Sequence, residues 1–187
     1  MVNHGEIETA FPKAKGQAVT FEGSRRSKLD GKGRMAVPAG YRGQLDPKYG
    51  NTLVVTRGYE GCLVLFPPEV WDARQKKVES RLGRKYEDPR VRKLLRVLSA
   101  NTETVTMDSQ GRILVPEHLR DMAGLVGEAL VLGVGNRMEV WDPARYQSYE
   151  DDVDLGTYEE LAAEFLADEP LYLVIEDDQG DEEEVDE

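Results

Sequence analysis

A ten-residue pattern occurs twice in this chain, and internal repetition constrains a fold more strongly than local propensities do. Residues 29–38 read LDGKGRMAVP, and residues 107–116 read MDSQGRILVP. An arginine follows the proline by four residues in both halves. The aligned pairs are Asp30 with Asp108, Gly33 with Gly111, Arg34 with Arg112, Val37 with Val115, Pro38 with Pro116, and Arg42 with Arg120.

A second match lies downstream in both halves, where FPPEVW at 66–71 aligns with WDPARY at 141–146. This alignment pairs Phe66 with Trp141 and Trp71 with Tyr146, and these aromatic residues are typical of core anchors. Two matching blocks in the same order predict a duplicated structural unit.

Each copy of the first pattern predicts a tight hairpin loop. The segment Gly31-Lys32-Gly33 has the length of a three-residue loop, whose last glycine adopts the positive φ that such a loop requires. Asp30 and Arg34 flank the loop, and residues that face each other across a hairpin project to the same side. We therefore expect the carboxylate and the guanidinium to form a charge-assisted pair.

The remaining periodicity predicts short helices and strand pairs around these loops. Pro38 and Pro116 suit the first position of a helix, and Gly124 suits the end of the second of these helices. Strand pairs are expected at 52–56 with 62–66 and at 129–134 with 138–141. A helix is expected over 69–82, and a second begins after the cap Asp88 and Pro89.

Charge divides the chain into a basic body and an acidic end. The net charge is −12, but residues 150–187 hold 18 acids and no Lys or Arg, whereas residues 22–100 hold 18 bases and 9 acids. The helix after Pro89 has a basic face with Arg90, Arg92, Lys93 and Arg96. We interpret this face as solvated, with nucleic-acid or partner contact as the alternative.

Several classes of protein are disfavoured by composition. Cys62 is the single cysteine, and with His4 and His118 it forms no zinc or disulfide pattern, so neither a metal site nor a cofactor is predicted. The sequence has no apolar run of 18 residues and no stretch of signal-peptide type. We therefore expect a cytoplasmic protein that binds neither a membrane nor a small-molecule substrate.

The signature D-x-x-G-R-h-x-h-P-x-x-x-R, in which h is apolar, resembles the DNA-binding unit of the AbrB superfamily of swapped-hairpin domains. Two copies closed by LFPPEVW and EVWDPARY resemble the MraZ family of bacterial transcriptional regulators, over about residues 21–149. The resemblance implies a β-rich α+β fold in which two AbrB-like units form a pseudo-dimer within one chain. It further implies ring-shaped homo-oligomers, a place on the nucleoid, and binding to short direct repeats in the promoter of the cell-division and cell-wall gene cluster, mostly as a repressor.

The resemblance implies that both loops contact DNA. Arginine grips guanine O6 and N7 with two parallel hydrogen bonds, and a neighbouring aspartate can orient it beforehand. A purely structural pair would also be duplicated, so that alternative stays open. Basic residues near the first loop suit phosphate contacts, whereas the second loop has Gln110 in place of Lys32. The predicted DNA-binding residues are Arg34, Arg112, Asp30, Asp108, Lys32, Gly33, Gly111, Arg25, Arg26 and Lys28. For Arg42 and Arg120 we favour packing or intersubunit pairing over base contact.

Two other functions compete with DNA binding. Asp30 and Asp108 could form the carboxylate dyad of a duplicated acid hydrolase, but an adjacent arginine lowers each pKa and prevents a shared proton, so no enzyme and no catalytic residue is predicted. The alternative is an antitoxin-type protein-binding module whose acidic tail binds a partner. The apolar PLYLVI at 170–175 would add a strand to that partner or to a neighbouring subunit.

The sequence departs from the family pattern at two places. The acidic residues of the tail should repel one another and keep it extended, either as a solubility appendage or as a competitor of DNA. Glu22 places an acid near the proposed DNA face. The predicted organisation is a mobile leader at 1–20, a first unit with linking helices at 21–99, a second unit at 100–149, and an acidic, partly disordered tail at 150–187.

Overall fold

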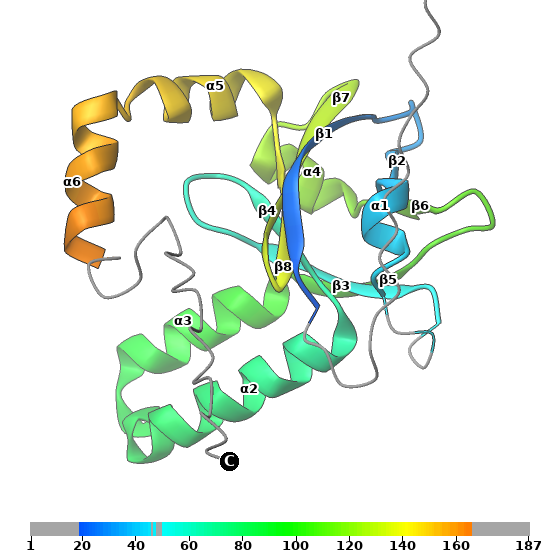
Figure 1. Ribbon diagram of the computed structural model, residues 1–187. Coiled ribbons are helices and arrows are strands. Elements are labelled where there is room, and N and C mark those ends of the chain that lie inside the picture. The colour runs from blue at the N-terminus through cyan, green and yellow to red at the C-terminus, as the bar shows by residue number, and fades with distance from the viewer. Residues whose placement is uncertain (1–18, 46, 48–49, 166–187) are drawn as a thin grey trace, which may run out of the picture. The chain divides into compact units, whose positions relative to one another are not determined.

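The chain forms two β-sheets with helices around them in a computed structural model, which describes residues 19–45, 47 and 50–165 (Figure 1). The first half contains β1 (Phe21–Lys28), β2 (Arg34–Ala36), α1 (Ala39–Arg42), β3 (Thr52–Arg57), β4 (Leu63–Phe66) and α2 (Pro68–Leu82). A 3₁₀ segment, η2 (Gly83–Glu87), and α3 (Pro89–Ala100) link it to the second half. The second half contains β5 (Thr102–Thr106), β6 (Arg112–Leu114), α4 (Glu117–Ala123), β7 (Glu128–Gly135), β8 (Arg137–Trp141) and α5 (Pro143–Asp151), followed by α6 (Leu155–Phe165).

The larger sheet shows that the two halves exchange strands. Its order is β1-β7-β8-β4-β3-β5, which is symmetric about the β8–β4 pair. The first strand of each half pairs with the other half, because β1 joins β7 and β5 joins β3 in antiparallel register. The smaller sheet contains one strand from each half, β2 and β6. The predicted fold class, a β-rich α+β fold built from two swapped units, is confirmed.

The structure confirms the predicted strand pairs, but it places the two prolines differently from the prediction. The expected hairpins form, with Val55 opposite Leu65 in β3–β4 and Val131 opposite Val140 in β7–β8. Pro38 and Pro116 stand one residue before their helices, as N-caps with extended backbone, rather than at the first helical position. Their carbonyls still accept the first helical hydrogen bonds, so each proline ends a strand and starts a helix.

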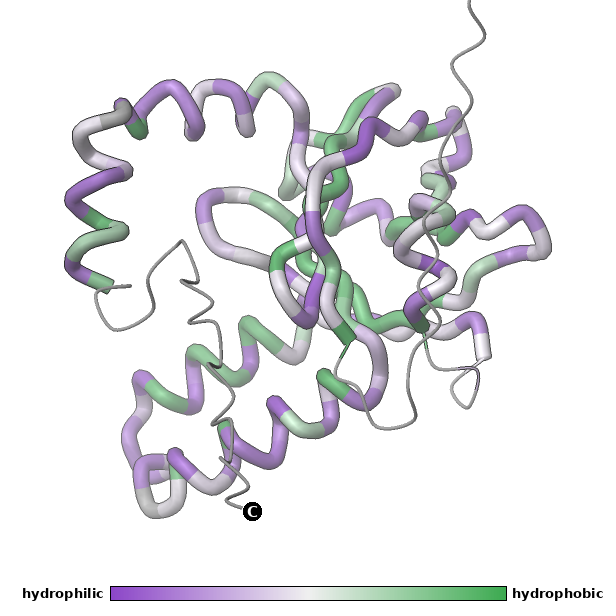
Figure 2. The backbone as a smooth tube through the Cα atoms, in the orientation of Figure 1, coloured by the Kyte–Doolittle hydropathy of each residue, from purple (hydrophilic) through white to green (hydrophobic). Residues whose placement is uncertain are grey.

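The main core lies between the six-stranded sheet and the β2–β6 pair. It includes Phe21, Met35, Leu53, Ile113 and Leu119, none of which is exposed, and Figure 2 shows hydrophobic stretches along the central strands. The predicted aromatic anchors form a second cluster in two equivalent pairs. The ring centroids lie 5.5 Å apart in Phe66–Trp71 and 5.6 Å apart in Trp141–Tyr146.

Helices α2 and α3 form where the sequence predicts them, but their apolar residues stay partly exposed. The Asp88 side chain caps α3 by accepting a hydrogen bond from the Arg90 N–H, and Pro89 takes the first helical position. Neither helix contains a buried residue, and Leu94 is 56% exposed. The two helices therefore present apolar surface that the described residues do not bury.

The last described residues, 148–165, belong to a second compact unit. The sequence predicts an extended segment here, whereas the structure forms helix α6, in which Tyr158, Leu161 and Phe165 recur at helical spacing. PLYLVI and the other tail residues at 166–187 lie outside the described residues, as do residues 1–18 of the predicted leader. Within the described ranges, no helix is long and apolar enough to cross a membrane.

Candidate nucleic-acid interface

The two D-x-x-G-R loops have the same backbone. The Asp30 N–H donates to the Arg34 carbonyl over 2.9 Å, and the Gly33 N–H donates to the Asp30 carbonyl over 2.8 Å. The second loop repeats both bonds at 2.8 Å between Asp108, Arg112 and Gly111. Gly33 and Gly111 have φ values of 79° and 73°, which explains why glycine occupies this position in both halves.

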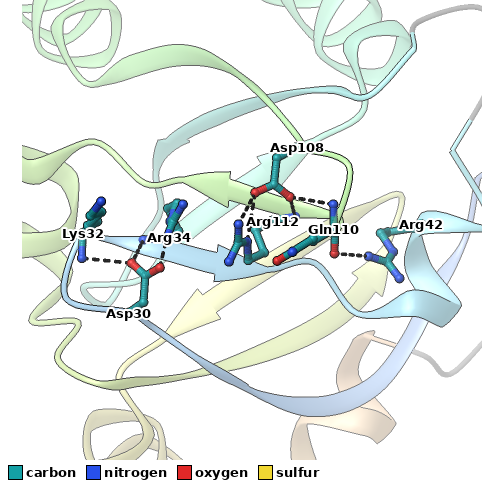
Figure 3. A network of polar contacts seen from close by, with 7 residues as sticks. All are labelled: Asp30, Lys32, Arg34, Arg42, Asp108, Gln110 and Arg112. Atoms are coloured by element: carbon teal, nitrogen blue, oxygen red, sulfur yellow. Dashed lines mark hydrogen bonds and ion pairs between the residues drawn. The ribbon is translucent and has the colours of Figure 1, made fainter.

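Each aspartate holds its loop and its arginine together. Asp30 Oδ1 accepts hydrogen bonds from the N–H groups of Lys32 and Arg34, and Oδ2 accepts one from Arg34 Nε at 2.8 Å. Asp108 repeats this set with Gln110 and Arg112, and Arg112 donates through both Nε and Nη2. Figure 3 shows the two arrangements on neighbouring strands.

The hydrogen bonds keep both carboxylates ionised. The backbone N–H of Arg34, followed by its side chain, lowers the pKa of Asp30 to about 2, although desolvation acts in the opposite direction. The Arg112 side chain, followed by its N–H, lowers the pKa of Asp108 from its usual value. A carboxylate fixed in this form orients an arginine and is poorly suited to sharing a proton.

Strands β2 and β6 bring both arginines to one surface. Arg34 lies opposite Leu114, Met35 opposite Ile113, and Ala36 opposite Arg112. Met35 and Ile113 are fully buried, so alternation turns the other four residues outward. We call this surface the ribbon face, and it consists of Arg34, Ala36, Arg112 and Leu114. Leu114 is 57% exposed there, whereas the two arginine side chains are about one third exposed.

The other predicted contact residues do not all reach the ribbon face. Lys32 is exposed in the first loop. Ser27 of β1 donates its hydroxyl to the Ala36 carbonyl, so Arg25 lies on the side of β1 that faces the ribbon, and Arg26 and Lys28 alternate to the other side. Arg26 forms an ion pair with Glu128 at 2.8 Å. The residues of the two loops therefore lie nearest to the ribbon face, and the DNA contacts expected for Arg26 and Lys28 remain predictions.

Comparison with known proteins assigns the chain to a family. The family model for MraZ protein, described as antitoxin-like, matches residues 20–91 and 98–167, one match in each half. The chain belongs to the MraZ family. Similar MraZ proteins include one from Nitrosomonas europaea, 40% identical over 126 residues, which are 67% of this chain and 83% of that protein. Another, from Acetivibrio thermocellus, is 34% identical over 155 residues, or 83% of this chain and 99% of that protein. Both are named transcriptional regulators.

This MraZ family member has a second surface that sequence reasoning did not identify. A groove of about 1550 Å³ lies along α2, α3 and the loop after β3, and apolar residues of both helices line it. They include Val70, Val78, Leu94, Leu95 and Leu98. The apolar spacing in α3 was visible in the sequence, but its exposure was not, because periodicity shows which face is apolar and not what covers it.

Proposed function

We propose that this chain is a sequence-specific DNA-binding transcriptional regulator that reads base edges with Arg34 and Arg112. The observation that carries the proposal is the ribbon face, where two arginines, each held by an ionised aspartate, project from a two-stranded β-ribbon. The major groove admits such a ribbon, and an arginine fork held in place matches guanine O6 and N7. Lys32 and Arg25 would contact phosphates, which set affinity and register.

The family resemblance supports a specific target. We infer that the chain binds short direct repeats upstream of the cell-division and cell-wall gene cluster, as a repressor without enzymatic activity. The protein would act in the cytoplasm, at the nucleoid. Because the first loop carries Lys32 where the second carries Gln110, the first loop is expected to contribute more to the salt dependence of binding.

Fluorescence anisotropy tests the proposal, with upstream DNA and scrambled DNA of the same length. Arg34→Ala and Arg112→Ala should each reduce the preference for upstream DNA about 5- to 150-fold, since a bidentate arginine–guanine contact contributes about 1–3 kcal/mol. Arg81→Ala removes the same charge from the exposed end of α2 and serves as the matched control. Equal losses in all three variants would show that charge alone, and not base reading, governs binding.

We further infer that copies of this chain assemble through the groove, and that the assembly is a ring. The exposed apolar residues of α2 and α3 support a contact with a second copy, because a monomer rarely leaves an apolar face of this kind uncovered. Several units in one ring would bind repeated DNA through a high effective concentration.

Light scattering after size-exclusion chromatography tests the assembly. Leu94→Asp places a charge on the apolar face and should lower the molar mass of the particle. Lys93→Asp is the matched control, because Lys93 is the preceding, polar residue of the same helix. An unchanged mass for Leu94→Asp would exclude this face as the interface.

An antitoxin-type module remains the second candidate, because the matching family model is described as antitoxin-like. In that case the acidic tail, residues 150–187, would bind a protein partner. Removal of these residues should then abolish partner binding without changing the preference for upstream DNA. The same truncation tests competition between tail and DNA, since competition predicts tighter binding to scrambled DNA at low salt.

A further inference from the structure

Each D-x-x-G-R loop is backed by an arginine from the other half of the chain. Arg120 Cζ lies 2.6 Å, and its Nε 2.7 Å, from the point where a Cβ on Gly33 would stand. The Arg42 guanidinium fills the same space at Gly111. The missing side chain of each loop glycine is thus replaced by an arginine that is distant in sequence.

The exchange of strands explains how these arginines reach the opposite loops. The Val37 N–H donates to the Gly111 carbonyl over 2.9 Å, and the Val115 N–H donates to the Gly33 carbonyl over 3.0 Å. The end of each ribbon strand therefore lies beside the loop of the other half. Because α1 and α4 start directly after these strands, their arginines, Arg42 and Arg120, lie behind the opposite loops.

Hydrogen bonds fix the two arginines in these positions. Arg42 Nη1 donates to the Gln110 carbonyl, inside the second loop, over 3.0 Å (Figure 3). Arg120 Nε donates to the Val115 carbonyl over 3.1 Å, next to the bond that joins Val115 to Gly33. Both arginines are partly buried against the loops that they back.

We propose that Arg42 and Arg120 are crosswise positioning residues. Arg120 sets the loop that holds Arg34, and Arg42 sets the loop that holds Arg112. The proposal rests on the proposed function, in which Arg34 and Arg112 read DNA. A residue that supports a reading arginine in this way acts on specificity without touching a base. Lysine cannot replace either residue, because it lacks the planar guanidinium that lies against the glycine.

Hydrogen exchange followed by mass spectrometry tests the crosswise assignment without DNA. Arg120→Ala should speed amide exchange severalfold in the peptide covering 29–35, with little change in 107–113, and Arg42→Ala should do the reverse. Arg120→Lys keeps the charge and should still speed exchange in 29–35, so it carries the test if the alanine variant does not fold. Faster exchange confined to the variant's own loop, or complete restoration by lysine, would overturn the proposal.

A double-mutant cycle with upstream DNA tests the consequence for reading. In an Arg34→Ala background, Arg120→Ala should reduce the preference for upstream DNA little further. In an Arg112→Ala background, it should reduce the preference as much as it does in the parent protein. Equal losses in both backgrounds would overturn the crosswise role. If exchange is crosswise but neither Arg34→Ala nor Arg112→Ala changes the preference for upstream DNA, the proposed function fails and the placement of Arg42 and Arg120 stands.

Discussion

Substitution of Gly133 by alanine should separate the exchanged strand β1 from its partner β7. Gly133 lies opposite Gly23 in the β1–β7 pair. A Cβ on Gly133 would stand 2.5 Å from the Phe21 carbonyl carbon and 2.9 Å from Glu22 Cα, closer than real Cβ atoms approach. Because these atoms are backbone, no side-chain rotation relieves the clash, and β1 has to move.

The expected loss in the free energy of unfolding follows from the contacts that β1 makes. Phe21 is fully buried, and the Tyr41 hydroxyl donates to the Gly23 carbonyl over 2.6 Å. Overpacking costs about 1–3 kcal/mol, and a lost hydrogen bond costs about 1 kcal/mol more, so we expect about 3 kcal/mol. For a chain of this length, that corresponds to a fall in Tm of about 6–12 °C.

The matched control is Gly135→Ala, at the end of the same strand. Gly135 has a φ of 60° and open space around it, so alanine there costs only the backbone term of about 1 kcal/mol. Thermal unfolding followed by circular dichroism, at one protein concentration, compares the two variants. A Gly133→Ala variant as stable as Gly135→Ala would refute the close approach of β1 and β7.

Three further outcomes are expected. Ile113→Ala should lower the free energy of unfolding by about 3 kcal/mol in urea titrations, whereas Leu114→Ala, the next residue and exposed, should change it by less than about 0.5 kcal/mol. Burial raises the pKa of the Cys62 thiol to about 12, so iodoacetamide should label it at pH 8 only after unfolding, as mass spectrometry would show. Because Asp30 has a folded pKa of about 2, below its usual 3.8, its ionised form stabilises the protein above about pH 4, and this contribution is lost as the pH falls toward 2. The difference in Tm between the parent and Asp30→Asn should shrink over the same range, and a constant difference would contradict the shift.

Local structure was predictable where neighbouring residues determine it. The duplicated loop, the contact of Asp30 with Arg34 and the strand pairs depend on residues a few positions apart, and the sequence shows them directly. The position of Gly33 followed from the backbone that a three-residue loop needs. Contact of the two arginines with DNA stays a prediction.

Contacts between the halves were not predictable from local patterns. The pairing of β1 with β7 joins residues about 100 positions apart, and only the family resemblance indicated an exchange. The place of Arg42 and Arg120 behind the opposite loops was not predictable for the same reason, because the repeated P-x-x-x-R aligns the two units and does not show which loop each arginine contacts. The sequence does not indicate that Arg26 pairs with Glu128, because Glu128 lies on β7, the strand that pairs with β1 from the other half.

The exchange of strands also sets the order of events during synthesis. At about 5–20 residues per second, the roughly 100 residues between the end of β1 and the start of β7 take on the order of 5–20 s to make. During that time β1 has no partner strand, and until α4 is made the loop of Arg34 has no Arg120 behind it. A nascent chain that ends before β6 therefore carries the first D-x-x-G-R sequence without the ribbon face that presents it, and a truncated product of that length would not compete with the finished protein for DNA.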